Sequence, residues 1–217
     1  MAQNMIFEVA AAPPFMTNGF VLGCPRTREG VIVDPGDCVD DLVAAAVRHG
    51  LRITRILLTH AHVDHVSGVA AAKRAFDVPV FLHKEDQFLY DAATQQGAMF
   101  GLRVEPPPPV DRHYGAGGEE LGFGDFAVDV HHTPGHCPGG VCLAVGRKGE
   151  AHRDLFVGDT LFSQSIGRTD LPGGDYETLM RSIKEVLFGF PDDTPVYSGH
   201  GPSTTIGDEK RTNPFLT

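Results

Sequence analysis

Short apolar runs recur along this chain, and most of them end at glycine, proline or aspartate. Runs of this length that are closed by turn residues are typical of buried strands. In the first half of the chain they predict strands over 5–12, 18–24, 30–37, 52–60 and 78–83. In the second half they predict strands over 126–132, 140–146, 154–160 and 195–201.

Helical patterns lie between many of these strands. Segment 38–50 has acidic residues early, apolar residues at helical spacing and Gly50 as a stop signal. Similar patterns predict helices over 67–76, 84–101 and 176–190. The proline run at 105–110 predicts an extended surface segment between two halves of the chain.

This order of elements predicts an α/β fold in which each half is a run of strands with helices attached. Two such sheets packed face to face, with the helices outside, form a four-layered αββα sandwich. The length of 217 residues suits one domain over 1–217, and 41% hydrophobic residues allow a sizeable core.

Composition and charge argue against several classes of partner. The net charge of −10 argues against a nucleic-acid groove or a surface for anionic membranes. No apolar run approaches the roughly 20 residues that span a bilayer, and residues 1–15 lack a secretory signal pattern. The four cysteines contain no C-x-x-C pair. We therefore expect a cytoplasmic protein without a nucleic-acid or membrane partner.

The stretch THAHVDH, residues 59–65, places four metal-capable side chains within a few positions: His60, His62, Asp64 and His65. On an extended segment, residues two apart point the same way, so His60 and His62 can face one ion. Asp64 and His65 follow the turn and can face a neighbouring ion. A single tetrahedral ion rarely takes all four ligands from one short loop, so the spacing favours two metals.

Three further candidate ligands each follow an apolar strand. His136 lies in a turn rich in glycine and proline, Asp159 follows DLFVG, and His200 stands between two glycines. Ligands held on loops at strand ends are the usual way in which α/β folds build their sites.

The four motifs THAHVDH, TPGHCPGG, GDTLF and SGHG, in this order, resemble the metallo-β-lactamase superfamily over nearly the whole chain. The resemblance implies two divalent metal ions. A first set, His60, His62 and His136, would hold one ion, and a second set, Asp64, His65 and His200, would hold the other. Asp159 would bridge the two.

A dinuclear site of this kind implies hydrolysis by a metal-bound hydroxide, because a bound metal lowers the pKa of water to about 7. We expect Asp64 to be required for catalysis. Zinc suits these imidazole and carboxylate ligands, and iron and manganese accept the same set.

Two longer segments, GDTLFSQSIGRTDLPGGD and SGHGPSTTIGDEKRTNPFL, resemble the glyoxalase II group, and most closely its short bacterial members. That resemblance implies hydrolysis of a glutathione thioester such as S-D-lactoylglutathione. Longer members have a C-terminal helical domain that binds glutathione, whereas this chain has only Lys210 and Arg211 near its end. Arg168 has two possible structural roles, pairing with Asp170 or capping the following helix. Alternatively, it can bind a substrate carboxylate bidentately.

The main alternative is a persulfide dioxygenase, which shares the GRTD segment. In that pattern His60, His136 and Asp159 would hold a single iron and His62 would be less engaged. The GHGP ending argues against it. A β-lactamase is opposed by the GRTD segment and by the N-terminus, and a nuclease is opposed by the acidic balance. A non-enzymatic metal-binding scaffold is opposed by the complete ligand set.

Several other residues receive less specific predictions. Asp34 is either a plain turn residue or, as the resemblance to the superfamily implies, a buried group that orients the histidine loop. Cys137 is either inert packing or sensitive to oxidation. Asp154 is expected to be a solvated turn residue, and His132 to be structural. The remaining histidines are expected to be solvated or locally bonded: His49, His83, His113, His131 and His152.

Overall fold

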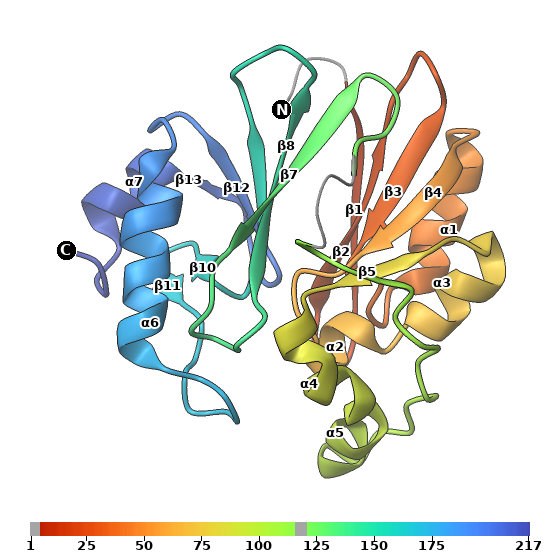
Figure 1. The fold of residues 1–217 in the computed structure, drawn as a ribbon, viewed down its shortest axis with the longest axis horizontal. Coiled ribbons are helices and arrows are strands. Elements are labelled where there is room, and N and C mark those ends of the chain that lie inside the picture. The colour runs from red at the N-terminus through yellow and green to blue at the C-terminus, as the bar shows by residue number, and fades with distance from the viewer. Residues whose placement is uncertain (1–4, 116–120) are drawn as a thin grey trace.

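The computed structural model describes residues 5–115 and 121–217, and in it two β-sheets face each other with helices on both outer sides (Figure 1). Helices α1 (Val39–Arg48) and α3 (Val69–Phe76) lie outside the first sheet. Helices α6 (Tyr176–Arg181) and α7 (Ile206–Thr212) lie outside the second. The predicted αββα sandwich is confirmed.

The first sheet has the strand order β1-β2-β3-β4-β5-β6. Its antiparallel part contains β1 (Ile6–Ala12), β2 (Thr17–Gly23) and β3 (Glu29–Val33). From β3 onward the pairs are parallel, and they add β4 (Arg52–Leu57), β5 (Val80–Leu82) and β6 (Arg112–His113). Because β3, β4 and β5 are parallel, the loops that follow them emerge at the same edge of the sheet.

The second sheet has the order β13-β12-β9-β8-β7. Its strands are β7 (Phe126–His132), β8 (Val141–Arg147), β9 (Asp154–Gly158), β12 (Pro195–Ser198) and β13 (Thr204–Thr205). A small ribbon of β10 (Leu161–Phe162) and β11 (Ser165–Ile166) follows β9.

Three apolar layers separate the four layers of secondary structure. One packs α1 and α3 against the first sheet, with Leu42, Ile56 and Val69 fully buried. The middle layer joins the two sheets through residues such as Phe20, Leu57 and Phe156. The third lies under α6 and α7. Burial of such apolar surface is the main driving force for folding.

Two predicted helices are broken into shorter pieces. Segment 84–101 forms a 3₁₀ turn η1 (Lys84–Asp86), then α4 (Gln87–Asp91) and α5 (Ala93–Met99). Segment 176–190 begins as α6 and continues as a π-helical turn η2 (Ser182–Val186) and a 3₁₀ turn η3 (Leu187–Gly189). The proline run forms no regular element, as expected, and Pro108 accepts a hydrogen bond from the Tyr90 hydroxyl. Within the described residues, no helix is both long and apolar enough to cross a membrane.

Candidate metal centre

The histidine stretch begins just beyond the end of β4. His60 lies in an irregular loop, and the short helix α2 (Val63–Val66) begins directly after His62. Asp64 and His65 are therefore helical residues, which the sequence had placed past a simple turn. The carbonyl of Thr59 accepts a hydrogen bond from Val141 N at the start of β8, at 2.8 Å. The histidine loop is thus fastened to the second sheet.

The structure brings all seven predicted ligand residues together. Within each of three groups, the candidate ligand atoms lie no more than 4.8 Å apart. Two of the groups are the first set and the second set defined above. The third places Asp159 with His60 and His65, between the two sets.

Single distances show how closely these side chains approach one another. His62 Nδ1 lies 2.8 Å from His136 Nε2, and His200 Nε2 lies 3.0 Å from Asp64 Oδ2. The Asp159 carboxylate reaches both sides, at 3.3 Å from His65 Nε2 and 3.7 Å from His136 Nε2. Gly199 permits this packing, because a Cβ there would lie 2.3 Å from Asp159 Oδ1 and 2.5 Å from the His65 ring.

Several buried polar atoms of the cluster have no hydrogen-bond partner among the described residues. They are His60 Nε2 and His62 Nε2, together with His65 Nε2 and Asp159 Oδ1, which lie 3.3 Å apart without forming a hydrogen bond. Leaving a buried polar group unsatisfied costs roughly 1–3 kcal/mol, so native structures rarely retain several in one place. Nitrogen and carboxylate donors facing one interior point fit divalent metal ions, which would satisfy these atoms.

The charges in the cluster lead to the same interpretation. Burial lowers the pKa of His60 well below its usual value and that of His62 to about 4. Both rings are therefore uncharged at neutral pH, and each can offer a nitrogen lone pair to a metal ion. Burial also acts on His65, but Asp64 and Asp159 outweigh it and raise its pKa. In the metal-free chain, protonated His65 balances the two carboxylates, and bound cations would supply that charge instead.

Asp34 orients the His65 side of the cluster. It lies just past β3 and is only 1% exposed. Its carboxylate accepts hydrogen bonds from Thr59 N at 2.7 Å and from the Thr59 hydroxyl, and it lies 3.0 Å from His65 Nδ1. Of the two expectations for Asp34, the structure supports the buried orienting group. His136 is oriented in a similar way, since its Nδ1 donates to the Arg168 carbonyl at 2.7 Å.

Asp86 is a buried carboxylate that the sequence analysis missed. It accepts hydrogen bonds from Ala61 N at 3.0 Å, from Gly139 N, and from the Cys137 thiol at 3.1 Å. Ala61 separates His60 from His62, and Cys137 follows His136. The sequence offered only one signal, the position of Asp86 shortly after a strand of the parallel sheet. Cys137 is fully buried and burial raises its pKa, which supports the inert-packing expectation.

Two cavities open beside the cluster and meet at Asp159, Arg168 and His200. The first, of about 230 Å³, has apolar walls from Phe15, Val63, Phe100 and Leu171. The second, of about 490 Å³, is lined by Phe162, Ser163, Ser165, Ile166, Gly201 and Pro202. The Arg168 side chain is exposed, and its Nε and Nη2 donate to the two Asp170 oxygens at 2.7 and 2.8 Å. The predicted pairing with Asp170 is thus present, and Arg168 also borders both cavities.

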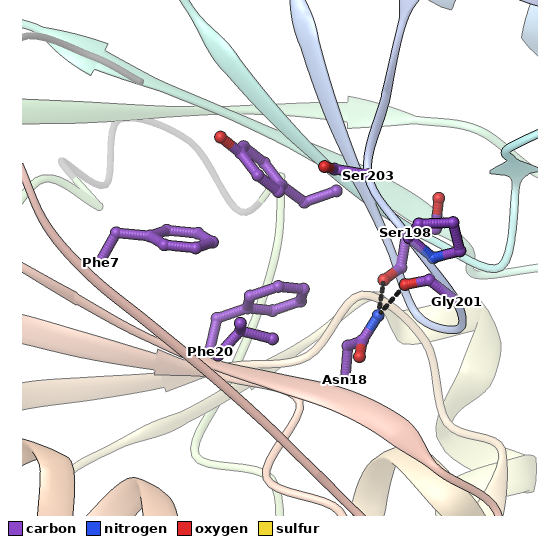
Figure 2. A pocket seen from close by; sticks show the side chains of 9 residues that line it. Phe7, Asn18, Phe20, Ser198, Gly201 and Ser203 are labelled. Atoms are coloured by element: carbon purple, nitrogen blue, oxygen red, sulfur yellow. Dashed lines mark hydrogen bonds between the residues drawn. The ribbon is translucent and has the colours of Figure 1, made fainter.

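A third cavity, of about 210 Å³, lies behind the His200 loop and has aromatic walls that include Phe7 and Phe20 (Figure 2). At its edge the Asn18 amide donates to the carbonyls of Ser198 and Gly201, at 3.0 and 2.9 Å. These two bonds hold the chain on both sides of His200.

The other histidines are locally bonded, as expected: His49 contacts Glu8, His113 contacts Gln87, His152 contacts Asp154, His131 packs on Phe190 and His83 stacks on His132. His132 donates to the Pro138 carbonyl, in keeping with a structural role. The expectation for Asp154 is wrong. It is the first residue of β9 and fully buried, because the strand begins there and draws it into the sheet.

Comparison with known proteins places this geometry in a family. A model of the metallo-β-lactamase superfamily matches residues 12–200. The hydroxyacylglutathione hydrolase GloC of Haemophilus influenzae is 39% identical over 190 residues, covering 87% of this chain and 88% of GloC. The chain therefore belongs to the metallo-β-lactamase superfamily, and the assignment makes it a metal-dependent enzyme.

Two solved structures are similar over almost their full length. The BLEG-1 B3 metallo-β-lactamase is 41% identical with a TM-score of 0.86, and the match covers 98% of this chain and all of BLEG-1. TTHA1623, solved in a di-iron-bound form, is 40% identical with a TM-score of 0.82, covering 96% of this chain and all of TTHA1623.

Proposed function

We propose that this member of the metallo-β-lactamase superfamily is a dinuclear metal hydrolase that cleaves a glutathione thioester such as S-D-lactoylglutathione. The observation that carries the proposal is the pair of ligand sets with Asp159 between them. The similarity to GloC supports the thioester substrate, and the SIGRTD segment supports the same group.

In this proposal His60, His62 and His136 would hold one ion, Asp64, His65 and His200 would hold the other, and Asp159 would serve both. When bound, divalent ions would supply an acidified water, with a pKa near 7, and would polarise an acyl carbonyl. A thioester suits this chemistry because its carbonyl is electrophilic and its thiolate leaves readily.

The chain's own residues keep the site in a single arrangement. Asp64 remains a carboxylate, because the neighbouring His65 and His200 outweigh its burial and lower its pKa. The Thr17 hydroxyl donates to Asp64 Oδ2 at 2.9 Å and restrains its rotation. Preorganised groups of this kind avoid reorganisation during the reaction.

The two cavities can each hold one part of the substrate on either side of the reacting centre. The apolar cavity suits an acyl group, and the larger one, which includes serine side chains, suits the peptide-like thiol. Arg168 borders both cavities, and in this proposal its guanidinium binds a glutathione carboxylate.

The decisive test compares three assays on the purified protein after metal analysis. We expect hydrolysis of S-D-lactoylglutathione with two metal ions per chain. One iron per chain and oxygen consumption with glutathione persulfide, without thioester cleavage, would establish the dioxygenase alternative. Cleavage of a chromogenic cephalosporin alone would favour the β-lactamase activity named for BLEG-1.

Substitutions at the two ligand sets test the mechanism separately. Asp64→Ala and His136→Ala should each abolish hydrolysis while the circular dichroism spectrum stays unchanged. His152→Ala, at a histidine outside both sets, is the matched control and should retain activity. Full activity in Asp64→Ala would show that the second set is not needed for catalysis.

A further inference from the structure

A second group of metal-capable side chains lies outside the cluster described above. His83 and Glu85 follow β5 of the first sheet, and His132 is the last residue of β7 in the second. Ligand atoms of the three side chains lie within 4.8 Å of one another. The two imidazole rings are stacked, with centroids 4.1 Å apart and an angle of 19° between their planes.

We propose that His83, Glu85 and His132 form a third metal site, which takes a divalent transition ion such as zinc, copper or nickel. Two imidazoles and a carboxylate are the donor set that such ions select, and zinc accepts it with water in the remaining position. Glu85 and His132 are exposed and His83 is half-buried, so an ion reaches the site directly from solvent.

The hydrogen bonding of His132 supports this assignment. Its Nε2 lies 2.8 Å from the Pro138 carbonyl oxygen, which can only accept, so this nitrogen carries the proton. Nδ1 is then left with a free lone pair. A histidine that donates one ring N–H to a backbone carbonyl and offers the other nitrogen is the usual arrangement of a metal ligand.

His83 is equally suited to bind an ion. Its Nδ1 accepts only a long hydrogen bond, 3.4 Å from Glu85 N, so binding a metal displaces little. Partial burial and the neighbouring His132 lower the pKa of His83, which keeps its ring neutral. A tetrahedral zinc ion with bonds of about 2.0–2.1 Å needs donor atoms roughly 3.3 Å apart, with both lone pairs directed at the ion, so metal binding requires the two imidazole rings to turn out of their stacked arrangement.

The site would join the two halves of the sandwich close to the interior cluster. His83 leads into Asp86, which bonds the backbone on both sides of the cluster, and Pro138 belongs to the loop that carries His136. An ion bound here would tie the ends of β5 and β7 together and stabilise the folded chain by mass action. The expected consequence is greater thermal stability with additional metal, and no new chemistry.

The test is a zinc titration of the metal-loaded enzyme by calorimetry, with metal content measured after gel filtration. We expect one more equivalent to bind to the wild-type chain than to His83→Ala or His132→Ala at micromolar free zinc. His152→Ala, which removes a histidine elsewhere on the surface, should keep that equivalent. The measured quantity is the difference in bound zinc per chain between the wild-type protein and each histidine variant. It does not depend on how many ions the interior cluster holds or on its activity.

A second measurement reports on the ligands of the ion directly and so does not depend on the stability of the variants. The electron paramagnetic resonance spectrum of Cu²⁺ bound at this site should show two nitrogen donors in the wild-type chain and one in either histidine variant. Glu85→Gln, which keeps the shape of the side chain, should weaken binding by about tenfold or more. Equal metal binding by the wild-type chain and both histidine variants would overturn the proposal.

Discussion

Two buried carboxylates, those of Asp34 and Asp86, form hydrogen bonds to the histidine loop from opposite sides, and their bonds reach different groups. The loop follows β4, Asp34 follows β3 on one side, and Asp86 follows β5 on the other. Asp34 bonds Thr59 and approaches the ring of His65, whereas Asp86 bonds Ala61 and Gly139, which lies in the loop between β7 and β8. Asp34 therefore sets the orientation of one ligand, and Asp86 sets the spacing between two ligand-bearing loops.

The difference matters because the two carboxylates reach the ligand sets differently. Asp34 reaches His60 of the first set only through the Thr59 hydroxyl, which lies 3.2 Å from His60 Nδ1. Asp34 touches His65, which belongs to the second set. Asp86 touches no histidine ring, yet its three hydrogen bonds fix the backbone that carries His60, His62 and His136, which is the whole first set. Groups that orient ligands typically change metal affinity or activity by about 10–100-fold when they are replaced.

Of the substitutions at these two carboxylates, Asp86→Asn is expected to have the larger effect. Both Asp86 oxygens accept from backbone N–H groups, Oδ1 from Gly139 and Oδ2 from Ala61. The asparagine NH₂ would have to face one of these donors, which cannot accept a hydrogen bond. We expect loss of the ion held by the first set, and a fall in activity near the upper end of about 10–100-fold.

The nuclear magnetic resonance spectrum of the cobalt-substituted protein would identify which ion is lost. The first set would contribute shifted ring signals from three histidines, and the second set would contribute signals from two. Asp86→Asn should lose the paramagnetically shifted ring signals of the first set. Asp37→Asn is a matched control, since Asp37 accepts from the Ser67 hydroxyl, which can reverse its role. Normal metal content in Asp86→Asn would show that its three hydrogen bonds do not position the loops.

A smaller effect, on the opposite set, is expected from Asp34→Asn. The asparagine oxygen can still accept from Thr59 N, and the Thr59 hydroxyl can turn to accept from the new NH₂. His65 Nδ1 loses its acceptor directly, whereas His60 is affected only through the Thr59 hydroxyl, which lies 3.2 Å from His60 Nδ1. We expect the second set to weaken more than the first, and an activity loss near tenfold, at the lower end of the range.

The same cobalt-substituted spectra test this prediction. In Asp34→Asn the three histidine signals of the first set should remain while those of the second set weaken. Loss of both ions in each variant would mean that the two carboxylates act as one unit, and the distinction drawn above would be wrong.

The contrast between Asp34 and Asp86 also shows what sequence can predict. Asp34 stands in VDPGD at the end of a predicted strand, and the resemblance to the superfamily implied an orienting role as one of two alternatives. Asp86 bonds residues 25 and 53 positions away, and the segment around it reads as a helix, so no local pattern marks it. Asp86 is fully buried at the end of η1, and α4 begins only at Gln87, three residues after the predicted start of the helix.

Motifs likewise explain why the interior cluster was predicted and the exterior one was not. THAHVDH places four of the seven interior residues in one stretch, and each of the other three follows a strand in a recognisable turn. His83 and His132 lie in different halves of the chain, and neither has a motif. Only the packing of the two sheets brings their rings together.

The smallest effect is expected from Arg168→Ala. The Arg168 carbonyl orients His136, and removing the side chain leaves that carbonyl in place. The exposed guanidinium already pairs with Asp170, so its loss should raise KM by about two- to fivefold, as for one exposed ion pair, without changing kcat or metal content. Arg26→Ala removes a similar exposed pair, with Asp125, away from both cavities, and serves as the control. An unchanged KM would show that the Arg168 side chain only pairs with Asp170 and does not bind the substrate. A lower kcat would show that it acts at the reacting group.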